Sequence, residues 1–328
     1  MYSQFKPEKH PILSLKSAST LISILLFTIF SSGNLNAQSA TGNPVSKEIS
    51  QQISLQHDND FLTLSDRYYS SGLFLSYTKS LRKLEKGDEN HQFSVILGQE
   101  IFTPSNITTT DISEQDRPYV GFLGINSSWS RVRKNRGIEA RLLIGLAGNN
   151  SGAGGFQRWY HNFLVVSDPP VWVGEMNNSF HANLYLNIHR EWRISPLPFS
   201  VSFGLQPELA FGTRDQYGQL KLMAFFGRRN RLMSSMAYRR IGNKSREIFF
   251  SLEFGYRQVF YNGMLQGNPL GDDSVLLIDS QERLLTGAFT LQHRYNQNEY
   301  RLGYHINSAE APETQSHKYI SLSFARNF

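Results

Sequence analysis

Cysteine is absent from this sequence of 328 residues, which excludes a disulfide framework, a thiolate nucleophile and a thiolate metal site. Charge of one sign is in small excess: the formal net charge is +6, and no basic block marks a surface for nucleic acid. Beyond residue 30 there is no apolar run of the roughly 20 residues that a membrane-crossing helix needs. We therefore expect no nucleic-acid partner and no helical membrane domain.

Aromatic residues, by contrast, are plentiful. The chain has 23 Phe, 15 Tyr and 4 Trp, yet its mean hydropathy is negative. A transmembrane β-barrel combines these two properties, because half of each strand faces lipid and the other half faces a polar interior. Without residues 1–37 the net charge is about +4, a mildly basic balance that suits anionic lipid headgroups.

The N-terminus has the features of a secretory signal peptide. Three lysines precede a short apolar segment, Leu21–Phe30, and small or polar residues follow it up to Ala37. The apolar segment spans about 10 residues, half the length of a membrane-crossing helix. We expect cleavage after Ala37 and a mature protein of residues 38–328; the alternative is an uncleaved anchor helix.

Apolar and polar residues alternate repeatedly along the rest of the chain, as in strands with one face in lipid. In residues 199–205, for example, Phe199, Val201 and Phe203 alternate with serine and glycine. The expected strands are approximately residues 50–58, 68–80, 92–103, 119–133, 137–147, 179–193, 198–212, 219–227, 232–241, 247–262, 282–296 and 299–307 or 317–328. Many are longer than the average of about 5–6 residues in globular proteins, which favours a barrel over a soluble β-sandwich.

The C-terminus supports the same fold class. The sequence ends on Phe328, and Ile320, Leu322 and Phe324 share its alternating register. A terminal aromatic residue in this setting is similar to the recognition signal of outer-membrane barrels. We expect an all-β, antiparallel up-and-down barrel of about twelve strands, because a closed barrel pairs every backbone amide within lipid. Bulky interior side chains would leave no wide pore, which favours an enzyme or a small-ligand protein over a general porin.

Alternation fails in residues 148–178, where a glycine-rich stretch precedes a segment compatible with two helical turns. Asp168-Pro169-Pro170 would end any such helix. If the segment is helical, Gln157 and His161 lie on one face, four residues apart. Histidine is the usual general base near neutral pH, and a neighbouring glutamine can donate to an oxyanion. The alternative is a surface histidine without a role.

Two further polar clusters precede this segment. A predicted hairpin carries Asn59-Asp60 at the end of its first strand and Asp66 at the start of its second. Calcium takes oxygen ligands of this kind, although a solvated polar turn has the same composition. In a later loop, Asp116 and Arg117 are interpreted as an ion pair that fixes the loop.

Together these motifs resemble the outer-membrane lipid A 3′-O-deacylase family, LpxR. The resemblance covers roughly residues 55–175 and rests on five matches: Asn59-Asp60, Asp66-Arg-Tyr-Tyr-Ser-Ser-Gly72, Gln99-Glu-Ile-Phe-Thr-Pro104, Asp116-Arg-Pro-Tyr-Val-Gly121 and Gln157-x-x-x-His161. It implies a twelve-strand barrel in the Gram-negative outer membrane, with a site among the outer loops and strand tops. It also implies calcium-dependent removal of the 3′-linked acyloxyacyl group from lipid A, so lipid A or lipopolysaccharide is the expected partner. We expect a monomer.

The family's site residues carry over only where the motifs match. His161 corresponds to the general base that activates water, and Asp60 to a calcium ligand. Asn59 and Gln157 would position the calcium site, the water or the oxyanion, and Ser70 stands where the family often has threonine.

Two departures from the family pattern weaken the prediction of this exact activity. The family's loop lysine corresponds to about Thr109 here, and its second acidic calcium ligand falls on Ser167, with Asp168 next to it as the substitute metal ligand. Two alternatives therefore stay open. One is a catalytically silent barrel with a structural or lipid-binding role, and the other is a small transport channel.

Overall fold

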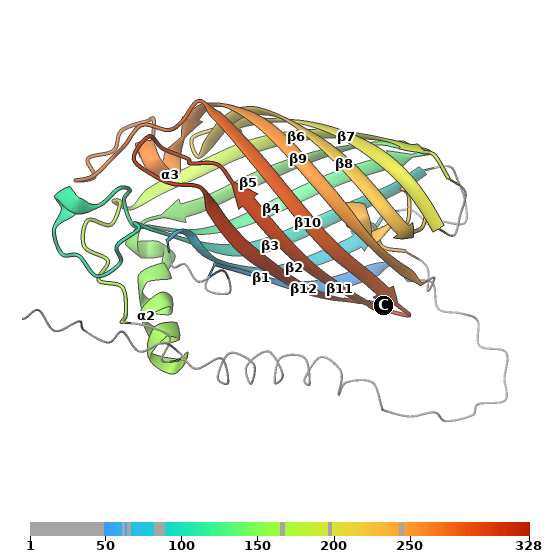
Figure 1. The fold of residues 1–328 in the computed structure, drawn as a ribbon, viewed down its shortest axis with the longest axis horizontal. Helices are drawn as coiled ribbons and strands as arrows, with labels where there is room; N and C mark the ends of the chain where they lie inside the picture. Colours follow the sequence, from blue (N-terminus) through green and yellow to red (C-terminus); the bar gives the residue numbers. More distant parts are fainter. Residues whose placement is uncertain are drawn as a thin grey trace, which may run out of the picture.

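The computed structural model describes residues 49–60, 63, 67–81, 89–164, 168–195, 199–242 and 246–328, and the expected signal peptide lies outside these ranges. Twelve strands close into one barrel in which consecutive strands pair antiparallel (Figure 1). The seam of the barrel is formed by β1 (Gln51–Asn59) and β12 (His317–Asn327). In the described ranges no helix is long and apolar enough to cross a membrane. The expected twelve-strand antiparallel barrel is confirmed.

The other elements follow in chain order. The remaining strands are β2 (Tyr68–Ser80), β3 (Glu89–Thr103), β4 (Val120–Arg133), β5 (Arg136–Ala147), β6 (Ser179–Arg193), β7 (Phe199–Gly212), β8 (Asp215–Arg228), β9 (Glu247–Asn262), β10 (Arg283–Tyr295) and β11 (Asn298–Asn307). The helices are α2 (Ala153–Leu164), α3 (Gly263–Gln266) and the 3-10 helices η3 (Ile112–Glu114), η4 (Asn149–Ser151) and η5 (Met236–Tyr238). The predicted strand at 232–241 is wrong, and the alternatives 299–307 and 317–328 are both strands.

Alternation along the strands separates a lipid-facing surface from a polar lumen. On β1, Ile53 and Leu55 are exposed on the outside, whereas Gln52 is buried. On β9, Leu252 is exposed in the same way and Ser251 is buried. An apolar belt of this kind is stable in a bilayer, and the closed ladder of strand pairs leaves no backbone edge in lipid.

The two ends of the barrel differ in the length of their connections. At one end, β4 joins β5 and β10 joins β11 through two residues each. At the other end lie long loops, including residues 104–119, 148–178 and 263–282, and Figure 1 shows α2 and α3 gathered there. Bacterial barrels have short periplasmic turns and longer extracellular loops, so the loop-rich end is the extracellular one.

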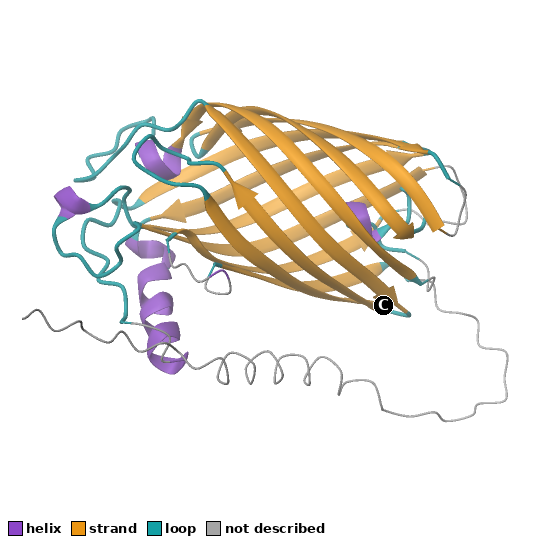
Figure 2. Ribbon diagram, in the orientation of Figure 1, coloured by secondary structure: helices purple, strands orange, loops and turns teal. Residues whose placement is uncertain are grey.

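The connection from β8 to β9 is an exception among the turns at the periplasmic end. Its residues 229–242, which we call the plug, fold back into the lumen. Figure 2 shows η5 within the periplasmic end of the barrel, near the C-terminus. Leu232, Met236 and Ile241 are buried, and Met236 packs in one cluster with Phe249 of β9. These apolar residues account for the wrong strand prediction, because they pack inside the barrel instead of facing lipid.

A buried arginine fastens the plug to the barrel wall. Arg294 of β10 forms ion pairs with Glu247, at 2.6 Å, and Glu299, at 2.7 Å. Its guanidinium also donates to the plug, at 2.6 Å to the carbonyl of Ser234 and at 2.7 Å to that of Arg240. Buried charges are stable only when fully paired, so these contacts hold the plug in one position.

The loop before β4 is fixed differently from the ion pair predicted for it. The Asp116 carboxylate accepts hydrogen bonds from the Tyr68 hydroxyl, at 2.9 Å, and from the Ser105 amide, at 2.8 Å. Arg117 is fully buried and reaches the Glu310 carboxylate at 3.4 Å. Asp116 thus binds the loop to β2, and Arg117 binds it to the β11–β12 loop, since a buried guanidinium requires a charged partner.

Candidate active site

The helix α2 confirms the predicted helical segment, and its start is set by small residues. Gly152 adopts a left-handed conformation with φ of +72°, and the Ala153 amide donates to the Ser151 hydroxyl at 3.2 Å. A side chain at Gly121 of β4 would overlap both the Ser151 hydroxyl and the Ala153 methyl group. The absence of a side chain at Gly121 therefore lets the helix begin directly against the barrel rim.

One face of α2 is buried against the barrel, and it carries the predicted pair. Gln157 and His161 are 3% and 5% exposed, and Ala153, four residues before Gln157, is fully buried. Their spacing of four residues places them on one helical face. On the opposite side, Trp159 and Phe163 are 56% and 69% exposed. Figure 1 shows the helix extending beyond the outline of the barrel at the loop-rich end.

The side chain of Gln157 is held at both ends of its amide. The Trp172 indole nitrogen donates to the Gln157 oxygen at 2.9 Å, and the Gln157 nitrogen donates to the Ser70 hydroxyl at 3.2 Å. An indole N–H can only donate, so it determines which end of the amide faces it. The amide nitrogen is thereby directed at Ser70 of β2.

Trp172 was not among the residues that the sequence pointed to. Its ring stacks on Tyr119 with the centroids 5.1 Å apart, and it packs with Ile101 and Ala153 in one buried cluster. A Cβ atom at Gly154 would lie 3.0 Å from the Trp172 ring, so the helix and the indole are in close contact. A single tryptophan in a long loop gives no sequence signal for this role.

Ser70 and Asn59 lie on neighbouring strands at the extracellular rim. The pairing of β2 with β3 shifts register between Tyr69 and Ser71, which leaves Ser70 in a β-bulge. Asn59 pairs directly with Ser71, and by strict alternation from Ile53 its side chain is on the outer face. Bulges redirect side chains, and this one lets Ser70 meet Gln157 of α2.

Asp60 is buried immediately after β1 and is held by backbone groups. Its Oδ2 accepts a hydrogen bond from the Arg67 amide at 2.8 Å, and its own amide donates to the Ser70 carbonyl at 3.3 Å. The Thr63 hydroxyl donates to the Asp60 carbonyl at 2.7 Å. The carboxylate is therefore rigidly placed, next to the strand position that carries Asn59.

The chemistry of these donors can be compared with that of a calcium site. Asp60, Asn59 and Ser70 offer a carboxylate, an amide oxygen and a hydroxyl, which are hard ligands suited to calcium. Asp168 is exposed in the turn after α2, whereas Asp66 and Ser167 lie outside the described residues. In the described ranges no three His, Asp or Glu side chains group closely enough to hold a metal ion. Any calcium site here would rest on one buried carboxylate, Asp60, with neutral oxygen ligands.

Thr109, which the family resemblance sets nearest to the expected lysine, has a local structural role. Its hydroxyl donates to the Glu114 carboxylate at 2.8 Å and accepts from the Asp111 amide at 3.2 Å. These bonds stabilise the turn around η3, on an exposed part of the loop before β4.

A titratable group near α2 was also missed by sequence reasoning. Glu175 lies in the loop after the helix, is partly buried, and has one carboxylate oxygen without a hydrogen-bond partner. Burial raises the pKa of the Glu175 carboxyl to about 7, and the positive charge of Arg158 opposes the shift only in part. Because Glu175 has no motif around it, only the fold reveals its environment.

The fold and this site define a class: outer-membrane β-barrels with a helical insertion against the outer side of the extracellular rim. The chain belongs to the LpxR family, since the family model described as outer membrane protein LpxR matches residues 21–328.

Among solved structures, LpxR from Salmonella typhimurium is similar, with a TM-score of 0.72 and 18% sequence identity, covering 84% of this chain and 100% of that chain. At this identity the likeness shows the fold. The beta domain of the Bordetella autotransporter BrkA is less similar, with a TM-score of 0.44 and 9% identity, covering 86% of this chain and 99% of that chain. A search of curated proteins finds no match.

Proposed function

We propose that this protein is an esterase that removes the 3′-linked acyloxyacyl chain of lipid A in the outer leaflet. The observation that carries the proposal is the buried face of α2, which holds Gln157 and His161 against the outer side of the barrel rim. A site there lies beside the bilayer, at the level where lipid headgroups meet water. An enzyme acting on a membrane lipid needs its catalytic groups at that level.

His161 would act as the general base. Its imidazole takes a proton from water while the water oxygen forms a bond to the ester carbonyl carbon. The resulting tetrahedral species collapses by breaking the bond between that carbon and the sugar oxygen. The proton on His161 then passes to the sugar oxygen, which leaves a free fatty acid and a hydroxyl on the glucosamine.

Gln157 would stabilise the charge that develops on the carbonyl oxygen. One of its amide protons is directed to Ser70, so the second is available to an oxyanion. Trp172 is a positioning residue, since it fixes the amide without itself reaching the ester. Asn59, one strand position before Asp60, would orient the attacking water.

Calcium is part of the proposal through Asp60. Asp60, Asn59 and backbone carbonyl oxygens of the same hairpin would hold the ion, with Asp168 as a further candidate ligand. Bound calcium would act as a Lewis acid that polarises the ester carbonyl.

The plug is evidence against the alternative of a transport channel. It fills the periplasmic end of the lumen with buried side chains such as Met236 and Ile241, and Arg294 holds it in place. Conductance in planar bilayers is therefore expected to be at background level. A steady open-channel current would instead favour transport.

Mass spectrometry of lipid A from cells that express the protein tests the proposal. The wild type and a His91→Ala control, altered at the periplasmic end, should both lose the mass of an acyloxyacyl group, whereas His161→Ala should leave lipid A intact. The same mass loss in His161→Ala would contradict the proposed mechanism. Intact lipid A in all three, with lipid A retained on the purified wild type, would support the catalytically silent alternative.

A further inference from the structure

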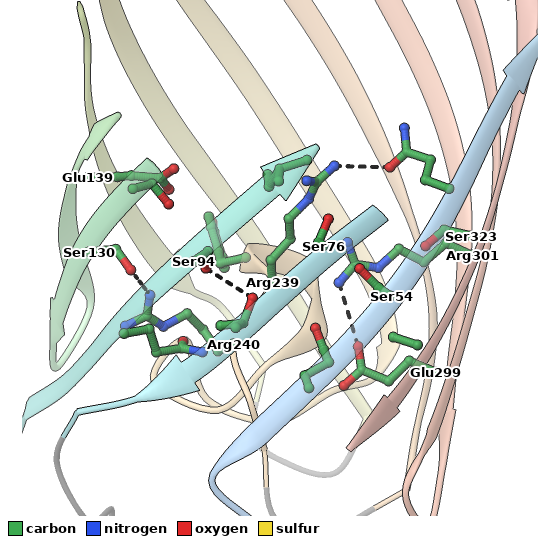
Figure 3. Close-up of a pocket in the computed structure, with 18 of the residues that line it drawn as sticks. Ser54, Ser76, Ser94, Ser130, Glu139, Arg239, Arg240, Glu299, Arg301 and Ser323 are labelled. Atoms are coloured by element: carbon green, nitrogen blue, oxygen red, sulfur yellow. Dashed lines mark hydrogen bonds and ion pairs between the residues drawn. The ribbon is translucent and has the colours of Figure 1, made fainter. Parts of the chain in front are cut away.

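A polar cavity of about 80 Å³ lies inside the barrel, apart from the candidate active site. It is bounded by the plug on one side and by the inward faces of β1 to β5, β11 and β12 on the other. Figure 3 shows side chains converging on it from opposite walls, with Arg239 and Arg240 entering from the plug and Arg301 from β11. The candidate active site uses the outer side of the rim, so the barrel wall separates the two.

The cavity lining has an excess of positive charge. Four arginines line it, Arg141, Arg239, Arg240 and Arg301, against two glutamates, Glu139 and Glu299. Glu299 is shared between Arg294, which lies outside the lining, at 2.7 Å, and Arg301 of the lining, at 3.7 Å, so Arg141, Arg239 and Arg240 face only Glu139 within the lining. The lumen is enclosed by lipid and protein, so this excess charge is screened far less than it would be at an exposed surface.

The guanidinium groups of the two plug arginines, Arg239 and Arg240, retain unused hydrogen-bonding capacity. Within the described part of the chain, the Arg239 guanidinium donates to the Gln56 amide oxygen at 3.1 Å, which uses one of its five N–H groups. Arg240 donates to Ser130 and Asn90, but its buried Nε has no partner. Guanidinium groups of this kind match the geometry of oxyanions.

A buried glutamine in the lining is a second, independent indication of a ligand. Gln92 is 1% exposed, and neither its amide oxygen nor its amide nitrogen has a hydrogen-bond partner among the described residues. Buried amides are almost always paired, because burial deprives an unpaired polar group of its hydrogen bonds to water. Serine hydroxyls, including Ser54, Ser94 and Ser130, add further donors around the same space.

We propose that this luminal cavity binds a small tetrahedral oxyanion of the phosphate or sulfate class. Such an ion would balance the excess charge of the arginines and accept hydrogen bonds from the guanidinium, serine and Gln92 donors. Water alone could satisfy Gln92, but it would leave the charge excess uncompensated. The ligand is a free inorganic ion, because the barrel wall separates the cavity from lipid headgroups.

Calorimetric titration of the refolded barrel in zwitterionic detergent, without lipid, tests this site with sodium phosphate as the probe. The ionic strength is held constant with sodium chloride. We expect saturable binding of one phosphate per barrel, and a thermal unfolding midpoint that rises with phosphate concentration. Absence of saturable heat, or an equal rise in the midpoint with chloride, would show a water-filled cavity and overturn the proposal.

Two variants that should change the phosphate affinity in opposite directions make the test more specific. Arg239→Gln should weaken phosphate binding about tenfold and Glu139→Gln should strengthen it about tenfold, since each changes one charge beside the anion. Arg283→Gln, at an exposed position on β10, is the matched control and should leave the affinity unchanged. His161→Ala should also bind phosphate normally. Equal affinities in Arg239→Gln, Glu139→Gln and the wild type would overturn the site even if one variant folded poorly.

Discussion

The indole nitrogen of Trp172 donates to the amide oxygen of Gln157 over 2.9 Å, across 15 residues of sequence. This bond joins the loop after α2 to the helix itself. It sets the orientation of an amide that lies one helical turn from His161 on the same buried face.

Replacing Trp172 with phenylalanine keeps the aromatic stack on Tyr119 but removes the donor. The buried Gln157 oxygen then loses its partner, which costs about 1–3 kcal/mol, and the amide is free to turn. We expect a fall of about tenfold in kcat for ester hydrolysis with little change in KM. Release of fatty acid from lipid A in detergent measures both constants. Trp192→Phe, on the outer surface of β6, should change neither, and a rise in KM alone would argue against a positioning role.

Removing the charge of Asp60 tests the calcium proposal. If Asp60 holds the ion, Asp60→Asn should raise the calcium concentration needed for half-maximal activity by about 10–100-fold. Titration of activity with calcium after chelation measures this shift. The variant Asp168→Asn tests the second candidate ligand. It should shift the calcium dependence of activity only if Asp168 also binds the ion. Activity that survives full chelation in the wild type would exclude a catalytic calcium ion.

Glu175 predicts a pH dependence of stability. Its carboxyl has a pKa of about 7 in the folded protein, against 4.5 for the unconstrained group, because it is buried. Between these two values the folded protein holds a proton that the unfolded chain has released, so stability is greatest below pH 4.5 and declines as the pH rises through 7. The loss is roughly 1–2 kcal/mol, after discounting for partial exposure.

The variant Glu175→Gln cannot ionise, so it should lack this decline and be more stable than the wild type at pH 8. Denaturant unfolding midpoints at pH 5 and pH 8, followed by tryptophan fluorescence, measure the difference. Glu313→Gln, at an exposed site in the β11–β12 loop, should keep the wild-type profile. Parallel profiles for Glu175→Gln and the wild type would mean that Glu175 is solvated.

The plug gives a prediction about stability that is independent of activity. Arg294→Met leaves the buried carboxylates of Glu247 and Glu299 without their shared cation, at a cost of about 3–5 kcal/mol. The denaturant midpoint should fall accordingly, and residues of the plug should become sensitive to added protease. Arg283→Met, which removes an exposed arginine from the same strand, should leave both unchanged.

The barrel could be predicted from sequence because its strands are governed by one rule. Each strand must present an apolar face to lipid. On β9, for example, Leu252 and Phe254 alternate with polar residues along a strand of 16 residues. This rule does not apply to the plug, for which it predicted a strand wrongly. Leu232, Met236 and Ile241 are apolar for a different reason, since they pack inside the lumen, and a residue type does not tell which side of the wall it faces.

The candidate site could be predicted only where it is local in sequence. Gln157 and His161 were placed together by helical spacing, and α2 does carry them on one buried face. The contact of Gln157 with Ser70 spans 87 residues and depends on a β-bulge, which no periodicity reveals. Trp172 acquires its role from packing against α2 and Glu175 from partial burial in the following loop, so both become visible only in the folded chain.

The seam between β1 and β12 joins the two ends of the barrel's chain. The Gln51 amide donates to the Phe328 carbonyl at 3.0 Å, and the Phe328 amide donates back to Gln51 at 2.9 Å. The wall therefore cannot be sealed until β12 has paired with β1. Until then, β1 and β11 would each present an unpaired backbone edge, which is costly in lipid. Pairing of β1 with β12 removes both edges at once, so this seam commits the chain to the lipid-stable closed form.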